Sequence, residues 1–274
     1  MKKTITLITS LFFILVLAAC GGDSASEDEN TIIVGAQSVP HAEILEKAKP
    51  ILEEKGITLE IEPYEDYVLP NDDLANGDLD ANFFQHIPYL EQTIEDTGYE
   101  LDYIDGIHIE PMGVYSQTIQ SVNDIPEGTE VILSNSVADH GRVLALFEQE
   151  GLITLNEETD KENATIDDIV DNPKDLTFSP DYDAAFLPEI YENEEDTLVV
   201  INTNYAINAG LNPLEDALFI EGEESPYVNV IAVKAEDKDN ETLNTLVDVL
   251  HSQEIQDFMI EEYEGAVVPV GQSD

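Results

Sequence analysis

The sequence of 274 residues has no tryptophan, a single cysteine and very few positively charged side chains. With Cys20 alone, the chain cannot form an internal disulfide. Its 10 lysines and arginines stand against 60 aspartates and glutamates, which gives a formal net charge of −50. Because such a surface repels the phosphate backbone of a nucleic acid, we expect no nucleic-acid partner.

The acidic residues are spread over the whole length, and 42% of all residues are hydrophobic, as in ordinary globular proteins. The chain is therefore not a disordered acidic tail, and its length suits one large or two ordinary α/β domains. Uniform acidity is best tolerated where salt screens the repulsion between like charges. We interpret it as a sign of a salt- or alkali-adapted bacterium.

The N-terminal stretch MKKTITLITSLFFILVLAAC combines two lysines, an apolar run from about Leu7 to Val16 and small residues before Cys20. These features predict a signal peptide over residues 1–19. An uncleaved membrane helix is the alternative, but the apolar run is shorter than the roughly 18 residues that a span requires. The LAAC segment resembles the lipobox of bacterial lipoproteins, which implies a lipidated Cys20 followed by a flexible tether over residues 20–30.

Strand patterns alternate with helix patterns after the tether, as in TIIVGA, PHAEILEKAKPILEEKG and TLEIEPYE. This alternation predicts an α/β fold with largely parallel sheets, arranged as two lobes. We expect the first lobe over residues 31–113 and the second over 114–228. A strand at YVNVIAVKA and a long helical stretch from about Glu241 to Glu264 then return the chain, over residues 229–274, to the first lobe.

The aromatic segment DANFFQHIPY joins a predicted strand to a helix opened by Pro88. In α/β folds, ligands bind at the loops that follow the carboxyl ends of strands. Phe84, His86 and Tyr89 are therefore candidates for a ligand pocket, with burial in the core as the alternative. Phe83 is expected in the core, because neighbouring strand residues point to opposite faces.

Arg142 is the only arginine of the chain, in the predicted helix HGRVLALFEQEG. We place it in the first helical turn, where the helix dipole disfavours a cation. A guanidinium kept in such a position suggests a bidentate partner for a carboxylate ligand, which lysine cannot imitate. An internal ion pair with an acidic side chain is the alternative.

Several motifs in the same order resemble the NlpA-type lipoprotein family, the methionine-binding proteins of ABC importers. They include VPHAEIL, DYVLPN, GDLDANFFQHIPYL, EPMGVYS, HGRVLAL, INTNYA and SPYVNVIAV, within residues 32–270. The resemblance implies a two-lobed periplasmic-binding-protein fold with a ligand cleft between the lobes. It also implies a lipid-anchored protein on the extracytoplasmic face of the cell membrane, which captures free methionine or a related apolar amino acid and delivers it to a membrane permease driven by a separate ATPase.

The resemblance further implies roles for individual residues. Tyr67, Phe84, His86 and Tyr89 would form the slot for the ligand side chain. Arg142 would hold the α-carboxylate, while Asn202 and Asn229 would bind the polar end of the amino acid. The chain departs from the family at NSVAD, where the family commonly has NDPTN. Asp139 therefore replaces an asparagine, and would either pair with the ligand ammonium or repel its carboxylate.

Two other classes of protein are weighed against this reading. A zinc-capture lipoprotein would draw on the five histidines His41, His86, His108, His140 and His251, but the sequence has no His-x-His pair or histidine-rich loop. An extracellular hydrolase would need a recognisable nucleophile, and no G-x-S-x-G elbow is present. We therefore expect no catalytic residues, no metal and no cofactor.

Overall fold

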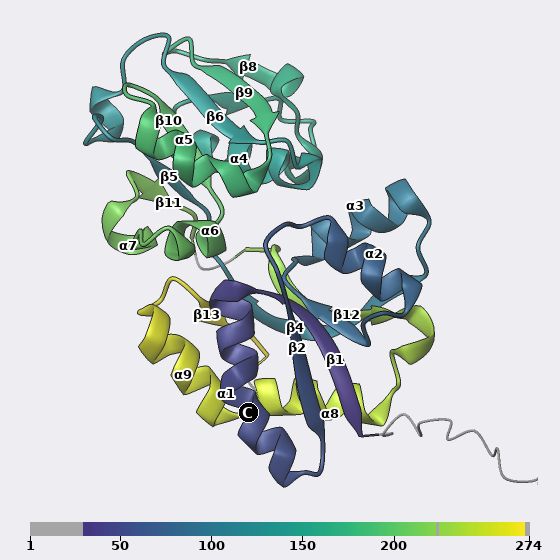
Figure 1. The fold of residues 1–274 in the computed structure, drawn as a ribbon. Coiled ribbons are helices and arrows are strands. Elements are labelled where there is room, and N and C mark those ends of the chain that lie inside the picture. The colour runs from purple at the N-terminus through teal and green to yellow at the C-terminus, as the bar shows by residue number, and fades with distance from the viewer. Residues whose placement is uncertain (1–29, 223–224, 272–274) are drawn as a thin grey trace, which may run out of the picture.

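The computed structural model describes residues 30–222 and 225–271, which form two α/β lobes (Figure 1). The sheet of the first lobe has the strand order β13-β4-β12-β3-β1-β2. Its strands are β1 (Thr31–Gln37), β2 (Thr58–Tyr64), β3 (Ala81–Phe83), β4 (Leu101–Ile109), β12 (Val228–Lys234) and β13 (Val268–Pro269). The late strands β12 and β13 thus complete a sheet begun at the N-terminal side of the described chain.

The sheet of the second lobe has the order β11-β5-β10-β6-β9. Its strands are β5 (Gly113–Tyr115), β6 (Glu130–Ser134), β9 (Thr177–Tyr182), β10 (Leu198–Ile201) and β11 (Phe219–Ile220), beside a small pair β7 (Thr154–Leu155) and β8 (Ile169–Asp171). The chain passes from the first sheet to the second between β4 and β5, and returns between β11 and β12. The crossing between β4 and β5 lies where the two lobes meet (Figure 1).

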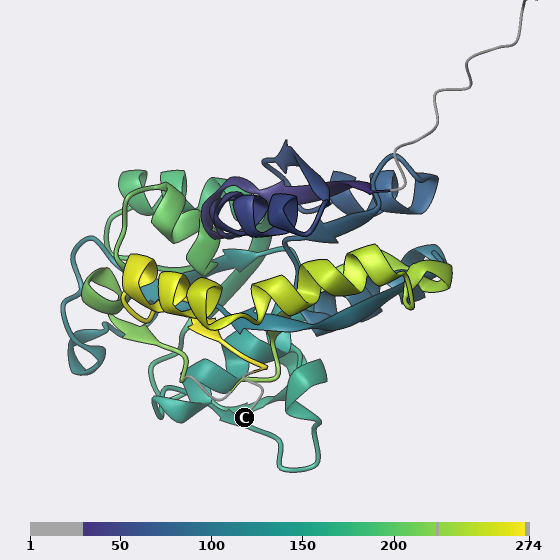
Figure 2. The same ribbon diagram turned by 90° about the horizontal axis from the view of Figure 1, so that it is seen from below.

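Helices cover both faces of the first sheet, as two perpendicular views show (Figures 1 and 2). One face packs against α1 (Glu43–Glu54), α8 (Glu241–Leu250) and α9 (Gln253–Tyr263), through fully buried residues such as Leu45 and Leu246. The other face packs against α2 (Leu69–Asn76) and α3 (Ile87–Thr97). Burial on both faces explains why the central strand β12, VNVIAVK, is almost continuously buried, whereas the edge strand β2, TLEIEPY, alternates between buried and exposed residues.

The second sheet is enclosed in the same way. The helix α4 (Val137–Gln149) shares a core with one face, and α5 (Leu187–Asn193) and α6 (Thr203–Asn208) share another core with the opposite face. The shorter elements are α7 (Pro213–Asp216) and the helical turns Ser38–Ala42, Val122–Asp124, Lys161–Asn163, Ile166–Asp168, Ala184–Phe186 and Ala235–Asp237.

Three expectations about the elements need correction. Both sheets are mixed rather than largely parallel: β12 runs antiparallel to β3 and β4, and β10 runs antiparallel to β5. The expected long C-terminal helical stretch is two helices, because Ser252 takes extended backbone angles between them. The helix that carries Arg142 begins at Val137, so the arginine lies in its second turn and not in its first.

Among the described residues, no helix is both long and apolar enough to span a membrane. The predicted signal peptide, the lipidated Cys20 and most of the tether lie outside the described residues. The predictions made for residues 1–29 therefore rest on the sequence.

Candidate functional site

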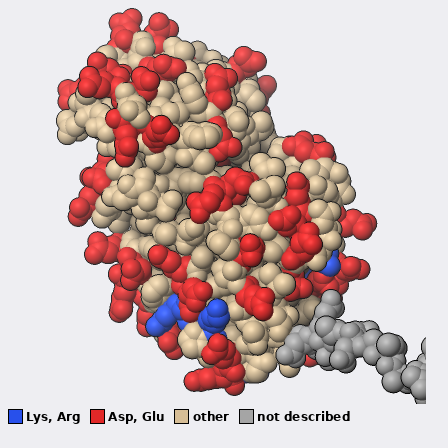
Figure 3. Space-filling view, viewed as in Figure 1, with Lys and Arg blue, Asp and Glu red and all other residues tan. Residues whose placement is uncertain are grey.

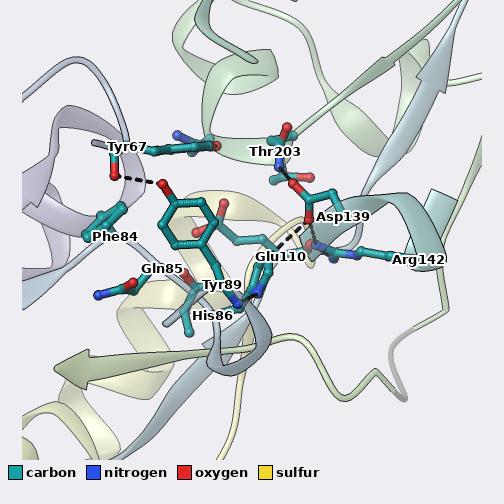
Figure 4. Close-up of a pocket in the computed structure, with 12 residues that line it drawn as sticks. Tyr67, Phe84, Gln85, His86, Tyr89, Glu110, Asp139, Arg142 and Thr203 are labelled. Atoms are coloured by element: carbon teal, nitrogen blue, oxygen red, sulfur yellow. Dashed lines mark hydrogen bonds and ion pairs between the residues drawn. The ribbon is translucent and has the colours of Figure 1, made fainter. Parts of the chain in front are cut away.

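A cavity lies between the two lobes. Its walls come from loops that follow strands of both sheets, as expected for an α/β fold. The lining residues are Tyr67, Phe84, Gln85, His86, Tyr89, Glu110, Asp139, Arg142, Asn202, Thr203, Asn204 and Asn229. Figure 4 shows Tyr67, Phe84 and Tyr89 on one side of this space and Asp139, Arg142 and Thr203 on the other.

The loop after β3 presents Phe84 and His86 to this space. Phe83 is fully buried in the core of the first lobe, as predicted, while Phe84 lines the cavity with 4% of its surface exposed. His86 occupies the N-cap position of α3, and Pro88 lies in the first turn. Proline suits the start of a helix, because its missing N–H would find no partner there in any case.

Three buried amides hold this loop in place. Gln85 exchanges two hydrogen bonds with Asn71, donating at 2.7 Å and accepting at 2.9 Å. Asn82 donates to the same Asn71 oxygen at 2.9 Å and accepts from Gln85 at 2.8 Å. Because a buried amide without partners is costly, this closed network favours one conformation of the loop.

Aromatic rings form the apolar end of the cavity. The ring of Tyr67 lies 5.9 Å from Phe84, 6.0 Å from Tyr89 and 5.0 Å from Tyr205, measured between centroids. The Tyr89 hydroxyl donates to the Tyr67 carbonyl at 3.0 Å, and the Tyr67 hydroxyl donates to Asn204 at 2.6 Å. Burial raises the pKa of Tyr67 well above its usual range, so its hydroxyl stays a donor. The contact with Asn204 joins the first lobe to the second.

His86 and Asp139 form a second contact across the cavity. The Nδ1 atom of His86 accepts the backbone N–H of Tyr89, so the ring proton must be on Nε2, which donates to Asp139 Oδ1 at 3.0 Å. The other oxygen of Asp139 accepts from Asn202 at 3.3 Å. Burial alone would raise the pKa of Asp139, but the bond from His86 and the nearby charge of Arg142 outweigh it and lower the pKa.

Arg142 reaches the same space from α4, with its guanidinium partly engaged. Its Nε and one terminal nitrogen, Nη2, donate to Glu221 Oε2 at 2.9 and 2.5 Å, and Nη2 also donates to the Glu110 carbonyl at 2.6 Å. The other terminal nitrogen, Nη1, lies 4.0 Å from Asp139. The guanidinium stacks on Tyr227 at 4.6 Å. Burial would lower the pKa of Arg142, but the charge of Glu221 raises it, and the residue stays a cation.

Glu110 is the second acidic residue of the lining, and it lies against two buried histidines. Its Oε1 atom is 2.8 Å from His108 Nε2 and 3.1 Å from His41 Nε2. His41 Nε2 is also 3.1 Å from Asn229 Oδ1. Burial lowers the pKa of His41 to about 4, so its ring is neutral near pH 7. The three ligating atoms of His41, His108 and Glu110 lie within 4.8 Å of one another, so these residues form a candidate metal cluster.

The cavity brings together every side chain that the sequence predicted for a ligand site: Tyr67, Phe84, His86, Tyr89, Arg142, Asn202 and Asn229. Their contact with a ligand remains a prediction. The alternative expected for Arg142, an internal ion pair, is present with Glu221, while its binding to a ligand carboxylate stays a prediction. Asp139 does point inward, toward His86 and Arg142.

Four residues line the cavity without having been predicted as site residues from the sequence: Gln85, Glu110, Thr203 and Asn204. All four stand inside the motifs FFQHIPY, EPMGVYS and INTNYA. Proximity to a predicted site residue was therefore the available signal. No periodicity distinguishes a Glu110 that faces a cavity from the many glutamates that face water.

Comparison with known proteins places this geometry in a family. The family model of the NlpA lipoproteins matches residues 32–271. The methionine-binding lipoprotein MetQ of Bacillus subtilis is 45% identical over 99% of this chain and all of its own length. The D-methionine-binding lipoprotein MetQ of Escherichia coli K12 is 36% identical over 97% of each chain.

The fold also matches a solved structure with a ligand. A nutrient-binding protein from Burkholderia cenocepacia, solved bound to methionine, superposes with a TM-score of 0.82 at 37% identity. The match covers 88% of this chain and all of the other. Family model, sequence relatives and fold agree over nearly the whole body, and the chain belongs to the NlpA lipoprotein family.

Proposed function

We propose that this protein is the substrate-binding lipoprotein of an ABC importer, and that it captures free methionine in the cavity between its lobes. One observation carries the proposal. The cavity has an aromatic end and a polar end, and both lobes contribute to it. An amino acid with an unbranched apolar side chain matches this division, and the relatives named above are methionine-binding lipoproteins.

The aromatic end suits a thioether. Tyr67, Phe84 and Tyr89 surround the space, and sulfur interacts favourably with aromatic rings by about 0.3–1.5 kcal/mol per contact. Such contacts favour methionine without excluding other apolar amino acids of similar length.

The polar end offers donors to a carboxylate. The Nη1 group of Arg142 is the part of the guanidinium that Glu221 does not engage. Asn202 from the second lobe and Asn229 from the first line the same cavity. We infer that the ligand carboxylate binds Nη1 and that the two asparagines complete its hydrogen bonds.

A ligand held by both lobes stabilises the closed arrangement over any open one, because it contacts both walls only when the lobes meet. Closure is then the state that the permease and its ATPase recognise.

We infer that Cys20 carries the lipid that keeps the protein at the extracytoplasmic face of the cell membrane. Two or more acyl chains would be needed there, since one chain anchors only marginally. The acidic surface suits a salt- or alkali-adapted host.

This role requires binding and release without chemistry, so we assign no catalytic residue. The test is calorimetric titration of the ligand-free protein with L-methionine, D-methionine, leucine and zinc, together with mass spectrometry of any ligand retained through native purification. Submicromolar binding of methionine supports the proposal. Binding of zinc alone would favour the metal-capture alternative, and consumption of a ligand would point to an enzyme.

A further inference from the structure

The cluster of Glu110, His41 and His108 lies at the wall of the cavity, and both histidines contact only one of the two carboxylate oxygens of Glu110. Both histidines are almost fully buried, with 1% and 0% of their surface exposed, and Glu110 is 7% exposed. Both Nε2 atoms approach the same oxygen of Glu110, Oε1. The other oxygen, Oε2, has no hydrogen-bond or ion-pair partner among residues 30–222 and 225–271, and Glu110 lines the cavity.

The cluster does not fit a metal site. A histidine that ligates a metal through Nε2 carries its proton on Nδ1 and almost always donates it to a second group. In this structure the Nδ1 atoms of His41 and His108 are buried and have no hydrogen-bond partner among the described residues. Nitrogen–oxygen distances of 2.8 and 3.1 Å are instead those of two N–H groups that donate to a carboxylate.

Two N–H donors on one oxygen keep Glu110 ionised inside the protein. Burial would raise its pKa, but the contacts with His41 and His108 and the charge of Arg142 lower it. The carboxylate therefore presents a negative charge to the cavity through an oxygen that no described residue uses. An ionised group in that position remains partly uncompensated until a cation or several donors approach it.

From this geometry we propose that Glu110 Oε2 accepts the α-ammonium group of the ligand, with His41 and His108 as positioning residues. This rests on the proposed capture of a free amino acid. Asp139 is the competing acceptor in the cavity, but both of its oxygens already have partners, His86 on Oδ1 and Asn202 on Oδ2. An ammonium group carries three donors and suits an acceptor that is ionised and open.

The two acidic residues of the cavity, Glu110 and Asp139, then have different roles. Glu110 selects ligands that carry an amine, while Asp139 joins the lobes through its contact with His86. The Glu110 main chain adds a link to the other end of the ligand, because its carbonyl accepts from Arg142 at 2.6 Å. The ammonium and carboxylate sites are therefore adjacent, as the two groups are in an α-amino acid.

The experiment compares methionine with its deamino analogue, 4-(methylthio)butanoate, by calorimetry on the wild-type protein, Glu110→Gln and Asp139→Asn. The glutamine keeps the shape and an acceptor oxygen for the histidines. We expect Glu110→Gln to weaken methionine binding about tenfold or more and to leave the analogue unchanged or tighter, so that the preference for methionine collapses. Asp139→Asn should keep that preference.

An equal loss for both ligands in Glu110→Gln would overturn the proposal, because it would indicate a general role in shaping the cavity. A preference that collapses in Asp139→Asn instead would assign the ammonium to Asp139. If Glu110→Gln does not fold, a crystal structure of the wild-type protein with methionine provides the test. A ligand nitrogen within about 3.2 Å of Glu110 Oε2 would support the proposal, and a nitrogen beyond hydrogen-bond distance would contradict it. A wild-type protein that binds other ligands but not methionine would refute the proposed function itself.

Discussion

At the scale of single residues, Arg142 combines two roles that usually belong to different side chains. It supports the structure through Glu221 and the Glu110 carbonyl, and it presents Nη1 to the cavity. A planar guanidinium can do both because its donors point in different directions. A lysine has a single charged nitrogen, which could bind either Glu221 or a ligand in the cavity but not both.

We therefore expect Arg142→Lys to weaken methionine binding by about 2–5 kcal/mol, the usual cost of breaking a buried charge pair. The measurement is calorimetric titration with methionine and with its carboxyl-amidated analogue. The wild-type protein should reject the amide strongly, whereas the lysine variant should bind both ligands poorly. Comparable affinities in all four titrations would show that Arg142 has only its structural role.

The aromatic end allows a similar test of the side-chain slot. Phe84→Ala removes a ring that lies 5.9 Å from both Tyr67 and Tyr89, and should weaken methionine binding by about 1–3 kcal/mol. Tyr182→Ala is a matched control, because Tyr182 is 41% exposed and is not among the residues that line the cavity. An equal effect of both substitutions on affinity would indicate that Phe84 belongs to the core and does not contact the ligand.

His41 links the site to the pH dependence of stability. Its pKa is about 4 in the folded protein, against about 6.5 when unfolded, so between these values the unfolded state alone binds the proton. The free energy of unfolding therefore keeps its full value above pH 6.5. It falls by up to about 3 kcal/mol as the pH is lowered toward 4, because only the unfolded state gains the proton. Urea unfolding at several pH values should show this loss in the wild-type protein but not in His41→Gln. Parallel curves for the two proteins would contradict the assignment.

At the scale of secondary-structure elements, the position of α4 depends on one glycine. A Cβ atom at Gly141 would collide with the carbonyl oxygens of Lys161 and Glu162, since the turn Lys161–Asn163 packs directly on the helix. The close approach fixes α4, and with it the depth at which Arg142 and Asp139 enter the cavity.

Gly141→Ala should therefore destabilise the protein by about 1–3 kcal/mol, although alanine is the better helix former. Thermal unfolding compares it with Gln149→Ala, a substitution at an exposed position of the same helix, which should change the melting temperature little. A variant as stable as the wild-type protein would mean that the turn moves away at little cost. In that case the depth of Arg142 would have another cause.

At the scale of the whole molecule, negative charge dominates both lobes. On the visible face, aspartate and glutamate side chains are scattered over both lobes, and lysine or arginine forms only a few small patches on the first lobe (Figure 3). With 60 acidic and 10 basic side chains, this surface repels itself in the folded state more than in the expanded unfolded chain. Self-repulsion of this kind is screened by salt.

The melting temperature should rise by several degrees when sodium chloride is raised from about 0.05 to about 1 M, because the Debye length falls from more than 10 Å to about 3 Å. Potassium chloride at equal ionic strength should have the same effect if screening is the cause. A rise with one cation only would indicate specific ion binding, and a fall in both salts would contradict the screening argument.

The sequence alone determined the order of most elements and the two-lobed architecture, through local signals such as apolar runs and helix starts at proline. Local signals also marked Phe84, His86, Tyr89 and Arg142 as candidates for a ligand site, whereas Tyr67, Asn202 and Asn229 were expected there only because their motifs resemble those of a known family. The pairing of β12 with β3 and β4 was not predicted, because pairing joins residues far apart in the sequence and leaves no local pattern. The same limit hid the difference between the two cavity acids. Asp139 and Glu110 are two carboxylates among 60 acidic side chains, and only the tertiary contacts of His86, His41 and His108 decide which of their oxygens is left open to a ligand.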